Sequence, residues 1–210
     1  NKMSKPKGLY REEFEKDACG IGFIAQLKNQ PSHSLVADAL KMLHRMEHRG
    51  GVAADDKTGD GAGIHTQIPH AFFSQLAAKE GVQLPDKEHY GVAMLFIPSS
   101  NTADFFSLLE EALTELNLAC VWKRRVPTNG VKLGDFARSN EPEVWQYFIR
   151  GEAGSGIDLN RRLYLFRKLC EHKAAMLEGG RAFYMSSCSV HSIVYKGELR
   201  TWQLDEYYPD

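Results

Sequence analysis

Seven consecutive residues without a polar side chain, from position 91 to position 97, constrain the fold of this chain most strongly. The run reads GVAMLFI, which is far shorter than the roughly 20 apolar residues that span a bilayer and is typical of a buried strand. The segment that follows, residues 102–116, places apolar side chains on one helix face at positions 105, 108, 109, 112 and 116. A buried strand followed by a one-sided helix predicts helices packed against a sheet.

The same alternation of strands and helices continues along the chain. We expect further strands at residues 19–27, 62–68, 119–126, 144–149, 182–188 and 192–196, the last two as a hairpin or an adjacent pair. We expect further helices from a cap at Ser34 to near Arg49, at 71–79 and at 159–177. This mixture of antiparallel-looking strands and intervening helices predicts an α+β fold built in layers.

The charge balance excludes several classes of partner. Lys and Arg number 26 and Asp and Glu number 27, so no long-range field recruits nucleic acid or an anionic membrane. The chain has no apolar run long enough to span a bilayer, and its first residues lack the apolar core of a secretory signal. We therefore expect a cytoplasmic protein without nucleic-acid or membrane partners.

The four cysteines, at positions 19, 120, 170 and 188, are widely spaced and form no CxxC pair. This spacing argues against a zinc site and against a disulfide framework, and it favours reduced thiols. Cys19 differs from the others because it opens the apolar run at 19–27, directly after eighteen mostly polar residues.

Cys19 has the setting that an N-terminal nucleophile requires. Cleavage of a leader, residues 1–18, would leave its thiol beside a free α-amine. Such an amine has a reference pKa of about 7.7–8.0, so it can accept the thiol proton near neutral pH. The alternative is a buried structural cysteine, because free cysteines are among the most buried residue types. From these residues alone both interpretations stay open.

Two motifs have metal-ligand spacing, and both are rejected. Residues 44–48, HRMEH, place two histidines about one helical turn apart, but Glu47 falls near the apolar stripe and no third ligand follows. Residues 56–61, DKTGDG, resemble the start of a calcium loop, but the twelfth position is Gln67 where the loop needs a glutamate. The sequence therefore predicts no metal site.

Three further features have ordinary structural interpretations. Residues 59–63, GDGAG, are not followed by the Gly-Lys-Ser/Thr of a phosphate loop, so we expect a tight turn that presents Asp60 or packs strands closely. Arg49 precedes a glycine pair and is as compatible with a structural role as with a catalytic one. The basic residues 123–125 are interpreted as a solvated sheet edge.

Several of these segments together resemble the start of the glutamate synthase large-subunit family. The resemblance rests on residues 17–23 (DACGIGF), 48–51 (HRGG) and 57–64 (KTGDGAGI), and the block at 58–63 (TGDGAG) is specific to the family. It extends over essentially all 210 residues, with further matches at 8–10, 67–73, 125–127, 193–197 and 207–210.

The resemblance implies that residues 19–210 are the N-terminal part of a class II glutamine amidotransferase domain, the first half of the αββα sandwich of N-terminal nucleophile hydrolases. It further implies a cleaved propeptide at 1–18, Cys19 as the nucleophile on L-glutamine, and Arg49, Gly50, Asp60 and Gly61 as support for the site. The family passes the ammonia through an internal tunnel to a synthase domain that makes glutamate from 2-oxoglutarate. That domain uses FMN, an iron–sulfur cluster and either NAD(P)H or ferredoxin, sometimes with a small reductase subunit, whereas this chain itself implies no cofactor.

Two departures from the family pattern keep alternatives open. Family glutaminase domains are about twice as long, and their substrate clamp and oxyanion hole would lie beyond Asp210, so we expect these 210 residues alone to turn over poorly. Residues 189–192 read SVHS where the family usually has SSRT, which removes a permanent charge at position 191. A non-catalytic module that works with a partner chain, or another class II amidotransferase, are the alternatives.

Overall fold

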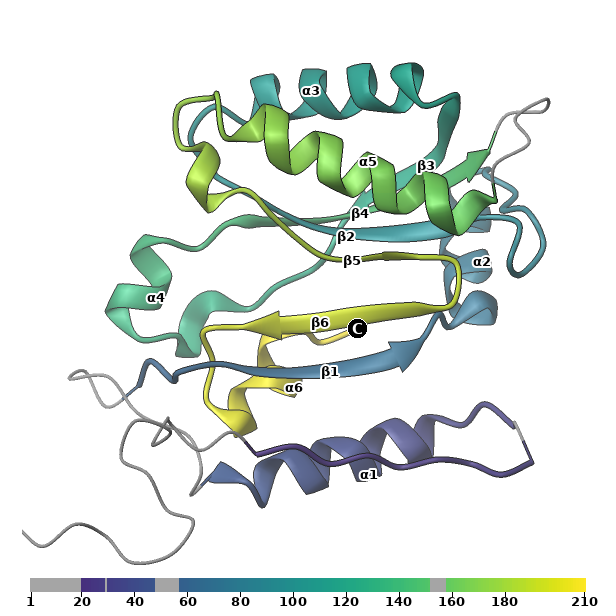
Figure 1. The fold of residues 1–210 in the computed structure, drawn as a ribbon. Helices are drawn as coiled ribbons and strands as arrows, with labels where there is room; N and C mark the ends of the chain where they lie inside the picture. Colours follow the sequence, from purple (N-terminus) through teal and green to yellow (C-terminus); the bar gives the residue numbers. More distant parts are fainter. Residues whose placement is uncertain (1–19, 29, 48–56, 152–157) are drawn as a thin grey trace, which may run out of the picture.

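The computed structural model describes residues 20–28, 30–47, 57–151 and 158–210, and arranges them in layers (Figure 1). Helices α3 (Thr102–Glu115) and α5 (Leu159–Ala174) form one outer layer. A four-stranded sheet, a two-stranded sheet and then helix α1 (His33–His44) follow in order. This helix–sheet–sheet–helix order, with antiparallel pairing throughout, confirms the predicted α+β fold class.

The larger sheet has the strand order β3-β4-β2-β5, with every neighbour antiparallel. Its strands are β3 (Leu118–Arg125), β4 (Glu143–Gly151), β2 (Gly91–Ile97) and β5 (Tyr184–Ser189). Every residue of β2 is buried, because this strand is central in the sheet and has another layer on each face. The uninterrupted apolar run at 91–97 is explained by that position.

Alternate side chains of β2 point into two separate cores. Ala93, Leu95 and Ile97 pack with the apolar faces of α3 and α5. Val92, Met94 and Phe96 face the second sheet and helix α2 (His70–Lys79), among a group of aromatic rings. In that group Phe148 lies 4.9 Å from Phe73, 4.6 Å from Trp122 and 5.9 Å from Tyr90, measured between ring centroids.

The smaller sheet pairs β1 (Ala62–Gln67) with β6 (Ser192–Gly197). Of the expected hairpin or adjacent pair of the last two strands, the hairpin is wrong, since β5 and β6 lie in different sheets and the chain changes layer between them. The two strands are nevertheless neighbours, because they contact each other across the layers. Serine side chains of β5 form hydrogen bonds to β6 across this change of layer. The Ser186 hydroxyl donates to the Val194 carbonyl at 2.9 Å, and the Val194 N–H donates to Ser187 Oγ at 3.1 Å. Side-chain oxygens thus replace ladder partners between the two layers.

The N-terminal expectations need correction. The strand predicted at 19–27 is wrong for residues 20–27, which contain no strand, because no strand among the described residues pairs with them. Ser32, rather than Ser34, caps α1 by accepting from the Ser34 N–H at 3.1 Å. Helix α1 also ends at His44, several residues before the predicted end near Arg49.

Five short elements were not predicted. They are η3 (Gly130–Lys132), α4 (Asp135–Ser139), η4 (Gly180–Ala182), η5 (Thr201–Gln203) and α6 (Leu204–Tyr207). Each has five residues or fewer, which is too few to show a helical period. Within the described ranges, no helix combines the length and the apolar character that crossing a membrane requires.

Candidate functional site

The glycine-rich turn before β1 is the part of the predicted site that the structure describes. Thr58 is buried, and Gly59 lies so close to the chain near Leu199 that a Cβ atom there would stand 2.4 Å from the Leu199 carbonyl oxygen. Gly61 has φ of +134°, a conformation that side-chain-bearing residues rarely adopt. Both glycines are therefore required by the backbone, one for close approach and one for its dihedral angle.

The same turn leaves one carboxylate accessible. Asp60 is exposed between the buried Gly59 and the first residue of β1, so the glycines fix the backbone on both sides of it. Gly63 also brings β1 close to β6, because a Cβ at position 63 would lie 2.7 Å from Lys196 Cβ in β6. The expectation was a tight turn that presents Asp60 or packs strands closely, and the described turn does both.

A charged cluster lies beside this turn, made of Glu47, Arg200 and Thr201. One oxygen of Glu47 accepts from Arg200 Nε at 2.6 Å and lies 2.6 Å from Arg200 Nη2. The other accepts from the Thr201 N–H at 3.2 Å and from the Thr201 hydroxyl. Partial burial alone would raise the pKa of Glu47, but the hydrogen bonds from Thr201 and Arg200 outweigh it and hold that pKa below its ordinary value.

Sequence reasoning placed Glu47 in a rejected metal motif and missed its two partners. Arg200 stands 153 residues further along the chain, and no local pattern links such distant positions. Across the described ranges, no group of three or more His, Cys, Asp or Glu residues is placed to hold a metal ion.

Three members of the predicted site, Cys19, Arg49 and Gly50, lie outside the described residues. The segment after Cys19 runs beside α1, where a Cβ at Gly22 would lie 2.5 Å from Met42 Sδ. Ile21, Phe23 and Leu27 on this segment are 92%, 88% and 99% exposed. The structure thus describes only Asp60 and Gly61 of the five predicted site residues, and the roles of all five stay predictions.

The three described cysteines are poor nucleophiles. Burial raises the pKa of Cys120 to about 11 and that of Cys170 to about 12. Burial also raises the pKa of Cys188, which lies on β5. Because the thiolate is the reactive form, the described part of the chain holds no activated thiol.

The expectation of a solvated basic edge at residues 123–125 holds for Lys123 and Arg125, which are exposed, and is wrong for Arg124. Residues 123–125 are on an edge strand, as predicted, but the Arg124 side chain is only 10% exposed. Its Nε donates to Gln146 Oε1 at 2.8 Å and its Nη2 to Asp210 at 2.5 Å. The buried Gln146 and the C-terminal Asp210 therefore hold Arg124 against the sheet, and a sequence pattern of three basic residues does not reveal these acceptors.

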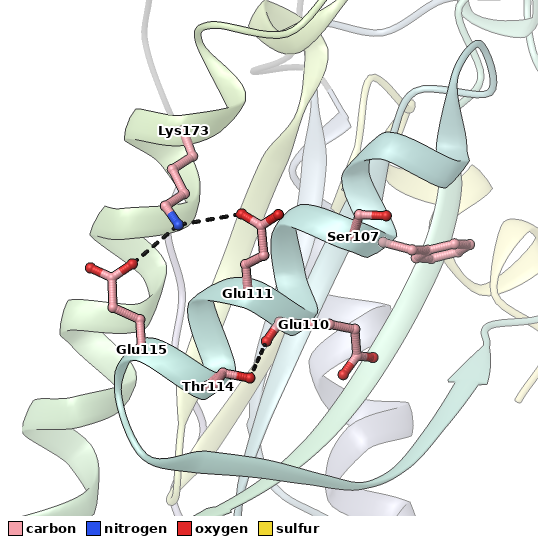
Figure 2. A pocket seen from close by; sticks show the side chains of 7 residues that line it. Ser107, Glu110, Glu111, Thr114, Glu115 and Lys173 are labelled. Carbon is pink, nitrogen blue, oxygen red and sulfur yellow. Dashed lines mark hydrogen bonds and ion pairs between the residues drawn. The ribbon is translucent and has the colours of Figure 1, made fainter.

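A hollow of about 790 Å³ lies in the outer helical layer between α3 and α5 (Figure 2). Three glutamates of α3 line it, and Lys173 of α5 reaches across to Glu115 at 3.1 Å and to Glu111 at 3.6 Å. The four-stranded sheet separates this layer from β1 and its glycine turn (Figure 1). The hollow is consequently not a candidate for the site around Asp60.

The family of this chain is shown by its similarity to known proteins. Residues 19–210 match the family described as glutamine amidotransferases class-II. The chain belongs to the class II glutamine amidotransferases. The resemblance found in the sequence is thereby confirmed, and the described turn, with its exposed Asp60, belongs to an amidotransferase domain.

Individual relatives of this amidotransferase domain are glutamate synthases. The chain is 41% identical to the glutamate synthase [NADPH] large chain of Bacillus subtilis, over 100% of its own length and 14% of the relative's. It is 40% identical to ferredoxin-dependent glutamate synthase 2 of Synechocystis and, again at 40%, to ferredoxin-dependent glutamate synthase 1 of Arabidopsis thaliana. These matches cover 93% of the chain and 12% of each relative, so the chain spans about an eighth of the curated relatives.

Proposed function

We propose that this domain hydrolyses L-glutamine in a glutamate synthase, with Cys19 as an N-terminal nucleophile. The observation that carries the proposal is the family match, which begins at Cys19 itself and runs to the last residue. A match that starts there supports residues 1–18 as a leader that is removed before Cys19.

The proposed reaction uses the thiol and the α-amine of one residue, Cys19. The Cys19 α-amine accepts the thiol proton, and the thiolate attacks the side-chain carbonyl carbon of glutamine. The protonated amine then gives its proton to the leaving nitrogen, the C–N bond breaks, and ammonia and a thioester result. Water adds to the thioester, the C–S bond breaks, and glutamate leaves with the thiol restored.

The supporting residues act on the pocket around that thiol. Arg49 offers a permanent charge and a fork of donors that suits carbonyl or carboxylate groups. Gly50, Asp60 and Gly61 form part of the pocket wall. The fixed backbone on both sides of Asp60 supports this assignment, because a site needs rigid positioning.

The rest of the proposed enzyme lies in the remainder of a longer polypeptide. There a synthase domain uses the ammonia to aminate 2-oxoglutarate reductively, with FMN, an iron–sulfur cluster and NAD(P)H or ferredoxin. A small reductase subunit and a cytoplasmic location belong to the same proposal. The names of relatives support both electron donors, since one reads NADPH and others read ferredoxin-dependent.

One observation favours a second candidate, a module that works only with further polypeptide packed on it. Ile21, Phe23 and Leu27 expose large apolar surfaces on a single short segment. Large apolar side chains exposed together on one segment favour contact with another protein segment. An amidotransferase that passes ammonia to a different acceptor is less favoured, because the relatives named above are glutamate synthases.

The complete polypeptide carrying Cys19→Ala tests the proposal. We expect loss of glutamine-dependent glutamate formation, while formation from added ammonium salts continues, because only the ammonia supply is removed. Full glutamine-dependent activity of the Cys19→Ala enzyme would overturn the nucleophile assignment.

A further inference from the structure

The solvent face of helix α3 is acidic. Its side chain at position 111 is 69% exposed, and those at 110 and 115 are each 55% exposed. Because the uncharged residues between the acids are small, the glutamates stand around the hollow of about 790 Å³ (Figure 2). The exposed residues of the helix are Ala103, Asp104, Ser107, Glu110, Glu111, Thr114 and Glu115.

The solvent face of the neighbouring helix α5 is basic and partly apolar. Arg161, Leu165, Lys168 and His172 are exposed and follow one another at intervals of four, three and four residues, which places them in one row along the helix. Tyr164 stands beside this row and is 58% exposed, while Leu165 is 40% exposed. Tyrosine and arginine are enriched where proteins contact each other, so this row has the composition of a contact surface.

Ion pairs within the chain do not neutralise either face. Glu111 and Glu115 share the single ammonium group of Lys173, at 3.6 and 3.1 Å. On α5, the two cations Arg167 and Lys168 share a single carboxylate, that of Glu171. Over its whole length α3 has four acidic residues and no basic one, whereas α5 has five Lys or Arg residues and one Glu. The two helices thus carry formal charges of −4 and +4, with histidine neutral.

The two oppositely charged faces lie side by side in one outer layer (Figure 1). A two-fold axis that runs along this layer, between the helices, places α3 of one copy over α5 of the other, and α5 over α3. Opposite charges then meet twice, because the surface patch of a two-fold dimer must complement itself. The same axis brings the row that contains Leu165 over the hollow in α3, so projecting apolar side chains meet a recess.

We propose that the outer face of α3 and α5 is an interface between two copies of this chain, with the acidic face of α3 in each copy against the basic face of α5 in the other. A partner of one charge sign would complement only one of the two helices, whereas a second copy complements both. The inference goes beyond the proposed function and is independent of it, because the four-stranded sheet separates this layer from the glycine turn (Figure 1).

Charge reversal in the complete polypeptide tests the interface. Glu111→Lys and Lys168→Glu each put like charges opposite each other at two symmetric places. We therefore expect the dimer dissociation constant, measured by sedimentation equilibrium, to rise about tenfold or more for each variant.

The matched controls are Asp38→Lys and Lys41→Glu on α1, in the outer layer on the opposite side of the molecule (Figure 1). Asp38 and Lys41 are 59% and 70% exposed, and they pair three residues apart, as Lys168 and Glu171 do. These reversals change the same charges at similar exposure outside the proposed interface. Both control variants should therefore keep the wild-type dissociation constant.

An equimolar mixture of the Glu111→Lys and Lys168→Glu chains identifies the partner. One chain then has amines at positions 111 and 168 and the other has carboxylates at both, so we expect the mixed dimer to form with the wild-type affinity. A carbodiimide, which joins an amine to a carboxylate in contact with it, should link position 111 of one chain to position 168 of the other. Peptide mass spectrometry locates this link, which can form only between two chains.

Three results would overturn the inference. The first is a wild-type polypeptide that does not associate, and the second is an unchanged dissociation constant for both interface variants. The third is weakened association that mixing does not restore, without a link between positions 111 and 168, which would indicate that a different partner covers this face. None of these results bears on glutamine hydrolysis, which Cys19→Ala tests separately.

Discussion

The side-chain amide of Gln146 joins the two sheets by donating to the Tyr195 hydroxyl at 2.8 Å. Gln146 is fully buried in β4 and Tyr195 lies in β6. The oxygen of the same amide accepts from Arg124, which also holds Asp210. This chain of hydrogen bonds, centred on the buried Gln146, fixes the smaller sheet, and with it β1 and the glycine turn, against the larger one.

Tyr195→Phe removes only the hydroxyl and leaves a donor of Gln146 without that acceptor. We expect a loss of about 1–2 kcal/mol in the free energy of unfolding, with a melting temperature lower by about 2–4 °C per kcal/mol. Thermal unfolding followed by circular dichroism measures it. Tyr164→Phe, at a side chain that is 58% exposed, is the control and should melt with the wild type. Equal melting of both variants would contradict the bridging role.

Gly59→Ala tests the close approach at the glycine turn. A Cβ at position 59 would meet backbone atoms, which cannot rotate away. We therefore expect the free energy of unfolding to fall by about 3 kcal/mol, the upper end of the usual cost of overpacking. At Gly197 a Cβ would meet the flexible Leu199 side chain at 3.1 Å, so Gly197→Ala should cost about 1 kcal/mol. Chemical denaturation separates the two, and a smaller loss for Gly59→Ala than for Gly197→Ala would contradict the packing described.

The cysteines give a prediction about reactivity and pH. Because burial raises the pKa of Cys120 to about 11 and of Cys170 to about 12, their thiolates are scarce at pH 8 and increase only as the pH rises towards those values. We expect iodoacetamide to leave both unmodified in the native protein at pH 8 and to modify them after unfolding. Peptide mass spectrometry measures this, and native modification of Cys170 at the rate of a free thiol would be the contrary result.

Glu47 predicts how stability depends on pH. Its pKa is lower in the folded chain than its ordinary value of 4.5, so its contribution is fully present above 4.5 and is lost as the pH falls through the lowered pKa. We expect Glu47→Gln to melt below the wild type at pH 7 and to approach it as the pH falls below 4.5. A melting difference that stays constant throughout this range would show that the carboxylate charge is irrelevant.

Sequence reasoning succeeded where a segment carries its own periodicity. The apolar run at 91–97 is β2, and the one-sided pattern from position 102 is α3, because burial on both faces or on one face dictates each pattern. It failed where the outcome depends on distant partners. Strand β6 lies in the second sheet because it pairs with β1. Residues 20–27 form no strand because no described strand pairs with them.

The same difference between local motifs and distant partners applies to the candidate site. The block around Asp60 was linked to a site by its resemblance to the family, because residues 58–63 form a continuous local motif. The partnership of Glu47 with Arg200 and Thr201 has no such signature, because it is made by folding alone. Arg124 was taken for a solvated residue for the same reason, since its acceptors Gln146 and Asp210 are distant in sequence.

Labelling of the complete polypeptide with diazo-oxo-norleucine tests the central claim most directly. This glutamine analogue has a diazo carbon that alkylates a nearby thiolate with loss of N₂, and peptide mass spectrometry locates the adduct. We predict a single adduct on an N-terminal Cys19, suppressed by excess glutamine and absent from Cys120, Cys170 and Cys188. An unlabelled Cys19, or one that still follows Ala18 in the active enzyme, would contradict the account.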